Sequence, residues 1–205
     1  AVTSPVPMPP LLGAQMIKQN IDLGASMVVY RGWAYGSGGW DPPTYTVNDI
    51  PALNNGWKLP VVMSFVCLTG DYTSSPACFG EAMVRQGTPE APGKGAVAFI
   101  GNGEHWSHTR YNDAMAIAMF ERITDDSLTD LGSLLDAGKL RFIDYFPDEL
   151  DAATHGEESV EFYFHIYNLL GDPELNYWRG APRAVTVAAP ALLPAGSNEV
   201  SVAVT

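Results

Sequence analysis

Three short apolar runs stand out along the chain, each separated from the next by polar or helical sequence. They are Met27 to Tyr30, Val61 to Val66 and Gly95 to Gly101. Continuous apolar runs of this length, joined by connections longer than tight hairpins, are typical of strands buried on both faces of a parallel sheet. The pattern therefore predicts an α/β fold with a mostly parallel sheet, and we expect catalytic loops at the carboxyl ends of its strands.

Apolar positions at helical spacing predict the helices that cover this sheet. Gly24 and the Gly171-Asp172-Pro173 sequence are placed to end two of them, and Ser127 is a candidate N-cap for another. The expected helices are Leu11 to Leu23, Asp49 to Leu53, Asn112 to Ile123, Ser127 to Leu135 and the aromatic-rich segment Glu157 to Leu170.

The two ends of the chain differ from this pattern. Residues 1–10 contain four prolines, which indicates an extended linker. From Ala184 to Thr205, short alternating segments predict the first strands of an antiparallel sandwich. Because three parallel strands are few for an independent sheet, we expect further strands from upstream sequence or another chain. The chain is therefore expected to belong to a longer polypeptide or a multi-chain assembly.

The charge limits the class of partner. A formal net charge of -12 disfavours nucleic acids and anionic membrane surfaces, because the average surface repels both. A basic or neutral polypeptide is easier to accommodate. The longest apolar runs are much shorter than the roughly 20 residues that cross a bilayer, so no membrane span is expected.

Cys67 is the first candidate for chemistry. It ends the second apolar run and precedes Leu68, Thr69 and Gly70, which places its thiol where a strand gives way to a loop. Backbone N–H groups of such a loop can stabilise a thiolate and a developing oxyanion, as nucleophilic cleavage of an amide requires. The alternatives are an inert buried cysteine and a disulfide with Cys78, which spacing alone does not decide.

The sequence around this cysteine resembles that of the gingipain-type cysteine peptidases. The similar segments are Pro60-Val-Val-Met-Ser-Phe-Val-Cys67-Leu-Thr-Gly-Asp-Tyr72 with Cys78-Phe-Gly-Glu81, the strand Gly95 to Gly101, and Tyr167-Asn-Leu-Leu-Gly-Asp-Pro-Glu-Leu175. The resemblance covers roughly Leu23 to Thr205. It implies a caspase-like three-layer α/β domain over residues 11–180 that lacks its first strands. The beginning of an immunoglobulin-like β-sandwich is expected to follow over residues 181–205.

The resemblance also implies an activity, with one departure from the family pattern. It implies hydrolysis of a polypeptide substrate through a Cys67 thiolate and an extracellular or cell-surface location. We expect no cofactor, with Ca2+ as the alternative considered below. The family places its catalytic histidine in a Tyr-x-Gly-His-Gly type sequence, which here reads Tyr30-Arg-Gly-Trp-Ala-Tyr-Gly36. Trp33 therefore occupies the histidine position, and an indole N–H donates a hydrogen bond but accepts no proton. Trp40 resembles a tryptophan that follows the family's histidine loop, which supports this alignment.

His105 and His108 are the candidate replacements for the missing base. They follow the strand that ends at Gly101, so we expect them at the same sheet edge as Cys67. Either can act as a base, or the two can bind a metal with Glu104, and the plain alternative is an exposed polar loop. His155 and His165 lie in a polar loop and on the aromatic helix, where packing or surface roles are expected.

The remaining candidates are binding residues. Trp33 and Trp106 are expected to border the cleft, and Trp33 can stack with Arg31 to close it. Asp71 and Glu81 can hold Ca2+ or orient a basic substrate, and the alternative for both is a solvated or helix-capping carboxylate.

Two functional hypotheses follow. The first is a gingipain-like cysteine peptidase in which Cys67 is the nucleophile. The second is a catalytically inactive relative that serves as a binding or structural module, which the tryptophan at position 33 favours. A histidine within about 3 to 4 Å of Cys67 distinguishes the first from the second.

Overall fold

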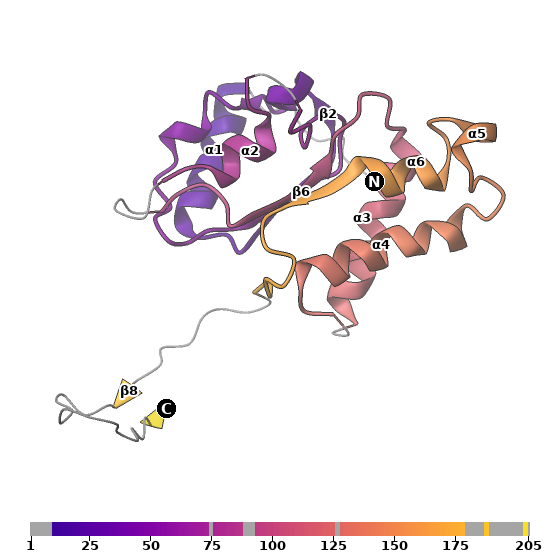
Figure 1. Cartoon of the computed structure of the whole chain (residues 1–205). Helices are drawn as coiled ribbons and strands as arrows, with labels where there is room; N and C mark the ends of the chain where they lie inside the picture. Colours follow the sequence, from indigo (N-terminus) through magenta and orange to yellow (C-terminus); the bar gives the residue numbers. More distant parts are fainter. Residues whose placement is uncertain are drawn as a thin grey trace, which may run out of the picture.

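A four-stranded sheet forms the centre of the fold (Figure 1). Its strand order is β1-β5-β6-β7, in which the first three strands are parallel and β7 is antiparallel to β6. The predicted mostly parallel α/β sheet is therefore confirmed. The strands are β1 (Met27–Tyr30), β5 (Val61–Ser64), β6 (Ala98–Asn102) and β7 (Tyr167–Leu170). The computed structural model describes residues 10–73, 76–87, 93–125, 128–178, 187–188 and 203–204.

Helices cover both faces of this sheet and make the fold three-layered (Figure 1). Along β5, Val61 and Met63 face one hydrophobic core while Val62 faces the other, as the two-residue period of a strand requires. The helices on one face are α1 (Pro10–Leu23) and α2 (Phe79–Val84), and those on the other are α3 (Thr109–Thr124), α4 (Leu131–Tyr145) and α6 (Val160–Ile166), with the short α5 (Ala152–His155) before α6.

The glycine-rich segment after β1 contains a second, small sheet that the sequence pattern did not indicate. Its strands pair antiparallel in the order β2-β3-β4. They are too short to show the alternation by which strands are recognised. The elements are β2 (Trp33–Ala34), η1 (Gly36–Gly38), β3 (Gly39–Asp41) and β4 (Tyr45–Thr46), followed by η2 (Ile50–Ala52), which corresponds to the short helix expected at Asp49 to Leu53.

Two helix predictions need correction. The helix expected at Ser127 to Leu135 begins at Leu131, where the Asp130 carboxylate accepts a hydrogen bond from the Ser133 N–H, and it continues to Tyr145. Ser127 itself lies outside the described residues.

The helix expected at Glu157 to Leu170 begins only at Val160, and the prediction was wrong over its last four residues. The helix ends at Ile166, and Tyr167 to Leu170 form β7. This segment pairs with β6, with Leu170 opposite Phe99, so the strand's backbone groups find partners in the sheet instead of in a helix. A short aromatic and aliphatic run fits either structure, and the open edge of β6 decides between them.

The ends of the chain are described only in part. Pro10 begins α1, and the rest of the predicted linker lies outside the described residues. Of the predicted immunoglobulin-like segment, the structure describes one antiparallel pair, β8 (Val187–Ala188) with β9 (Ala203–Val204). That domain therefore stays a prediction. Within the described part of the chain, no helix is both long and apolar enough to cross a membrane.

Candidate active site

Cys67 lies in the loop that leaves the carboxyl end of β5, as the sequence predicts. The next residue, Leu68, has a φ of 61°, which non-glycine residues rarely adopt. The chain therefore turns sharply directly after the cysteine. Backbone outliers of this kind are concentrated at functional sites, so the turn after Cys67 is a candidate functional site.

The turn is fixed to the end of β6 by close backbone contacts. The Leu68 N–H donates to the Glu104 carbonyl at 3.1 Å, and the Gly70 N–H donates to the Asn102 carbonyl at 2.8 Å. A Cβ on Gly70 would lie 2.9 Å from the backbone of Gly101, so this approach requires glycine. These contacts hold the Cys67 loop beside the loop that carries the candidate histidines.

A buried polar contact links the same turn to the small sheet. The Ser64 hydroxyl lies 2.8 Å from the Thr69 hydroxyl and accepts a hydrogen bond from the indole N–H of Trp40 at 2.9 Å. Trp40 is 1% exposed and stacks on Tyr30 with ring centroids 4.6 Å apart. Trp40 thereby anchors the loop after β1 against the loop after β5.

One pocket of about 380 Å³ contains most of the predicted site residues. Cys67 lies in its wall together with both candidate histidines, His105 and His108, and both candidate aromatic residues, Trp33 and Trp106. The remaining lining residues are Ala34, Gly36, Leu68, Ser107 and Thr109.

The immediate partner of the Cys67 thiol is a serine. Its Sγ lies 3.1 Å from the Ser107 Oγ and 3.7 Å from the Ser107 carbonyl oxygen. Among the described residues, no histidine forms a hydrogen bond with Cys67. Sequence reasoning missed Ser107, although it lies between the two candidate histidines and shares their loop.

Each candidate histidine has a neighbour other than the thiol. The His105 ring packs edge-on against Trp106, with centroids 4.5 Å apart. The Nδ1 of His108 lies 3.9 Å from the Glu158 carboxylate. Both imidazoles therefore share the pocket with Cys67, and neither is paired with it in this conformation.

Trp33 lines this pocket and exposes its indole to solvent. The side chain is 73% exposed, whereas its backbone is held by the Tyr30 hydroxyl, which lies 3.0 Å from the Trp33 carbonyl and 3.2 Å from its N–H. The expected stacking of Arg31 on Trp33 was wrong. The Arg31 guanidinium instead donates to the Asp113 carboxylate and, at 3.2 Å, to the Thr109 carbonyl.

Glu81 is the predicted site residue that does not line this pocket. Its carboxylate accepts a hydrogen bond from the Cys78 N–H at 3.0 Å and lies 3.7 Å from Arg85, so it caps the start of α2. Asp71 accepts hydrogen bonds from Thr73 within its own turn. A binding role for Glu81 stays a prediction.

The disulfide alternative for Cys67 is wrong. Both cysteines are free thiols, so the alternative of a Cys67–Cys78 disulfide is excluded. Cys78 is buried at the start of α2, and this burial raises the pKa of its thiol. In this conformation the described residues form no group of three or more His, Cys, Asp or Glu side chains that could hold a metal ion, and metal binding by Glu104, His105 and His108 stays an untested alternative.

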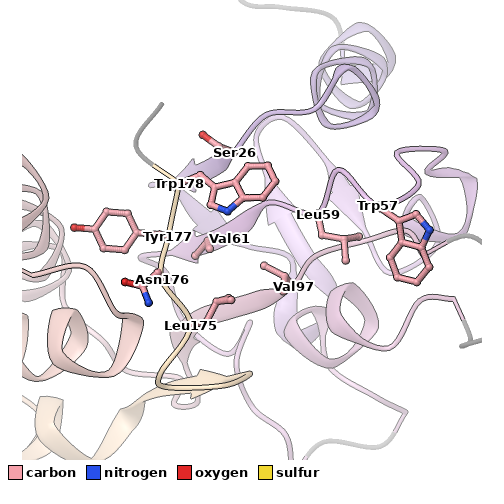
Figure 2. A pocket seen from close by; sticks show the side chains of 9 residues that line it. All are labelled: Ser26, Trp57, Leu59, Val61, Val97, Leu175, Asn176, Tyr177 and Trp178. Atoms are coloured by element: carbon pink, nitrogen blue, oxygen red, sulfur yellow. The ribbon is translucent and has the colours of Figure 1, made fainter. Parts of the chain in front are cut away.

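A second pocket, of about 140 Å³, lies at the opposite edge of the sheet (Figure 2). Figure 2 shows Trp57 and Trp178 at its two ends, with Leu59, Val61 and Val97 between them. Its lining contains no cysteine, histidine or carboxylate. The Cys67 pocket is therefore the better candidate for an active site.

Comparison with known proteins identifies the family of this chain. A model of peptidase family C25 matches residues 10–178. The chain belongs to peptidase family C25. It is 27% identical over 187 residues to Lys-gingipain HG66 of Porphyromonas gingivalis, and 26% identical over 184 residues to gingipain R2 of the same species. These alignments cover 80% and 88% of this chain, but only 10% and 23% of the two relatives.

Solved structures show the same fold. The crystal structure of the Arg-specific cysteine proteinase gingipain R matches with a TM-score of 0.67 at 23% identity, and covers 93% of this chain and 42% of its own. A complex of pro- and mature domains of a Porphyromonas gingivalis gingipain matches with a TM-score of 0.69 at 21% identity, over 93% and 43% of the two chains. The caspase-like α/β fold is therefore confirmed.

Proposed function

We propose that this chain is a cysteine peptidase domain in which the Cys67 thiolate attacks a peptide bond bound in the pocket beside it. The observation that carries the proposal is that Cys67, His105 and His108 line one pocket at the carboxyl edge of a parallel sheet. The Cys67 backbone N–H has no hydrogen-bond partner among the described residues, so it is available to the oxyanion.

The reaction needs a base that also acts as an acid. An imidazole takes the thiol proton, the thiolate adds to the carbonyl carbon, and the C–N bond breaks as the amine receives that proton. Water then hydrolyses the thioester. Because the indole of Trp33 accepts no proton, His105 or His108 must approach Sγ when substrate binds. Catalytic hydrogen bonds commonly tighten only in the substrate complex.

The pocket wall points to a substrate class. It carries two exposed indoles, Trp33 and Trp106, and no carboxylate among its described lining residues. A pocket of this kind favours an aromatic or aliphatic side chain, because apolar surface is buried without an unpaired charge. We therefore do not extend to this chain the preference for Lys or Arg that the names of the relatives state. With a net charge of -12, the domain should act on neutral or basic polypeptides at an extracellular or cell-surface location.

Digestion of a peptide mixture tests this proposal. We expect mass spectrometry to find new ends next to aromatic or aliphatic residues, and none with Cys67→Ala. One of His105→Ala and His108→Ala should lower the rate by about 10²- to 10⁴-fold, the usual contribution of a positioned base. Cleavage that persists in Cys67→Ala, or an equal rate in both histidine variants and the parent, would contradict the mechanism.

The exposed Trp33 supports a second candidate function. A domain without a paired histidine can retain the pocket as a polypeptide-binding module of a larger assembly. In that case calorimetry should detect binding of the same aromatic or aliphatic peptides, with equal affinity in the parent and in Cys67→Ala. The digestion experiment should then give no products from either protein.

A further inference from the structure

Ser107 is the start of a hydrogen-bonded row that runs from Cys67 into the protein interior. The Ser107 Oγ lies 3.1 Å from the Cys67 Sγ and accepts a hydrogen bond from the Asn112 Nδ2 at 3.0 Å. The Tyr167 hydroxyl in turn donates to the Asn112 Oδ1 at 2.7 Å. The row therefore connects the thiol to the first turn of α3 and to the beginning of β7.

The inner members of this row are fixed by burial. Asn112 is 2% exposed and Tyr167 is 0% exposed. A buried amide or phenol is costly unless its hydrogen bonds are made, and here each makes its bond within the row. The Tyr167 ring also packs beside Phe65 and Tyr163, with centroids 6.2 and 6.3 Å away. The Ser107 hydroxyl is consequently held from behind by rigid groups.

The available protons fix the direction of donation in the inner part of the row. Tyr167 has one hydroxyl proton, which goes to the Asn112 oxygen, and the Asn112 N–H goes to Ser107. Ser107 thereby accepts from Asn112 and still has its own proton, which it donates to the sulfur when Cys67 is a thiolate, because a thiolate only accepts. Burial raises the pKa of Tyr167 well above its usual value, so its end of the row stays a donor across the working pH range.

We propose that Ser107, Asn112 and Tyr167 are positioning residues that hold a hydroxyl donor against the Cys67 sulfur and so stabilise its thiolate. A hydrogen bond to an ionised acceptor is stronger than one to a neutral acceptor, so the row favours the charged form of the sulfur. This contact needs no imidazolium beside the sulfur. It therefore compensates in part for the absence of a histidine at position 33. The inference rests on the proposed function in taking the thiolate as the nucleophile.

The rate of iodoacetamide alkylation of Cys67 between pH 5 and 10 tests the row. The whole chain is used, and peptide mapping separates label on Cys67 from label on Cys78. Ser107→Ala should move the midpoint upward by about one to two pH units, as loss of a charge-assisted hydrogen bond requires. Ser107→Thr, which keeps the hydroxyl, should retain the parent midpoint. If Ser107 had only a structural role, both substitutions would change the midpoint alike.

Asn112→Asp and Tyr167→Phe test the inner members. An aspartate at position 112 only accepts, so it takes the Ser107 proton away from the sulfur, and the midpoint should rise at least as far as in Ser107→Ala. Tyr167→Phe should raise it less. If either variant fails to fold by circular dichroism, the two Ser107 variants decide. A midpoint in Ser107→Ala equal to or below that of the parent overturns the proposal.

The outcome separates this inference from the proposed function. If the parent cleaves no peptide but Ser107→Ala raises the midpoint, the proposed peptidase function is contradicted and the proposed role of the row is supported. Peptide cleavage by the parent, with an unchanged midpoint in Ser107→Ala, would contradict the proposed role of the row and support the proposed peptidase function.

Discussion

The loop after β1 and the loop after β5 leave neighbouring parallel strands at the same edge of the sheet, yet they are built differently. Tyr30 and Ser64, the last residues of the two strands, are paired in register. Ser64 and Thr69 hold the β5 loop through buried hydroxyl contacts, whereas Trp33 in the β1 loop is 73% exposed. The part of the site that presents the nucleophile is rigidly supported. The part that should present the base carries an exposed indole, so its side chain can change with little effect on the fold.

The largest expected effect comes from Trp33→His. The Tyr30 hydroxyl holds the backbone at this position, so the new imidazole should enter the Cys67 pocket without disturbing it. If proton transfer limits hydrolysis, peptide turnover should rise by about 10²- to 10⁴-fold. Trp33→Phe, which adds no base, is the matched control and should give no gain. Equal turnover in the two variants would mean that the missing histidine is not what limits this site.

The next effect is on stability and concerns the β5 loop. In Gly70→Ala the new Cβ meets the Gly101 backbone, which has little room to move. Such overpacking costs about 1 to 3 kcal/mol, which should lower Tm by roughly 2 to 12 °C in a domain of this size. Gly38→Ala in the β1 loop is the control, because nothing lies within 4 Å of its Cβ. An equal loss of Tm in both variants would contradict the proposed difference in rigidity between the two loops.

The smallest effect is expected from Arg31→Gln. This change removes the ion pair with Asp113, which ties the β1 loop to α3. The two side chains are 28% and 50% exposed, and a surface pair of this kind contributes about 0 to 1 kcal/mol. Tm should fall by no more than about 4 °C, and less in 0.5 M salt because of screening. A loss larger than that of Gly70→Ala would show that the β1 loop also depends on a rigid support.

The same contrast explains what the sequence could predict. The parallel strands and the place of Cys67 were predictable, because a buried strand leaves a continuous apolar run and the cysteine ends one. Tyr167 to Leu170 were not, since their structure depends on pairing with β6. Ser107 was not either, because it is separated from Cys67 by 40 positions and meets it only in the folded chain.

Cys67, in the pocket it shares with Trp33, is proposed as a nucleophile directed at polypeptides. Labelling of the folded protein with a peptidyl acyloxymethyl ketone carrying an aromatic side chain, followed by intact mass and peptide mapping, tests this proposal most directly. We expect one adduct, on Cys67, and none on Cys78 or in Cys67→Ala. A protein that iodoacetamide alkylates at Cys67 but that forms no adduct with the peptidyl probe would contradict it.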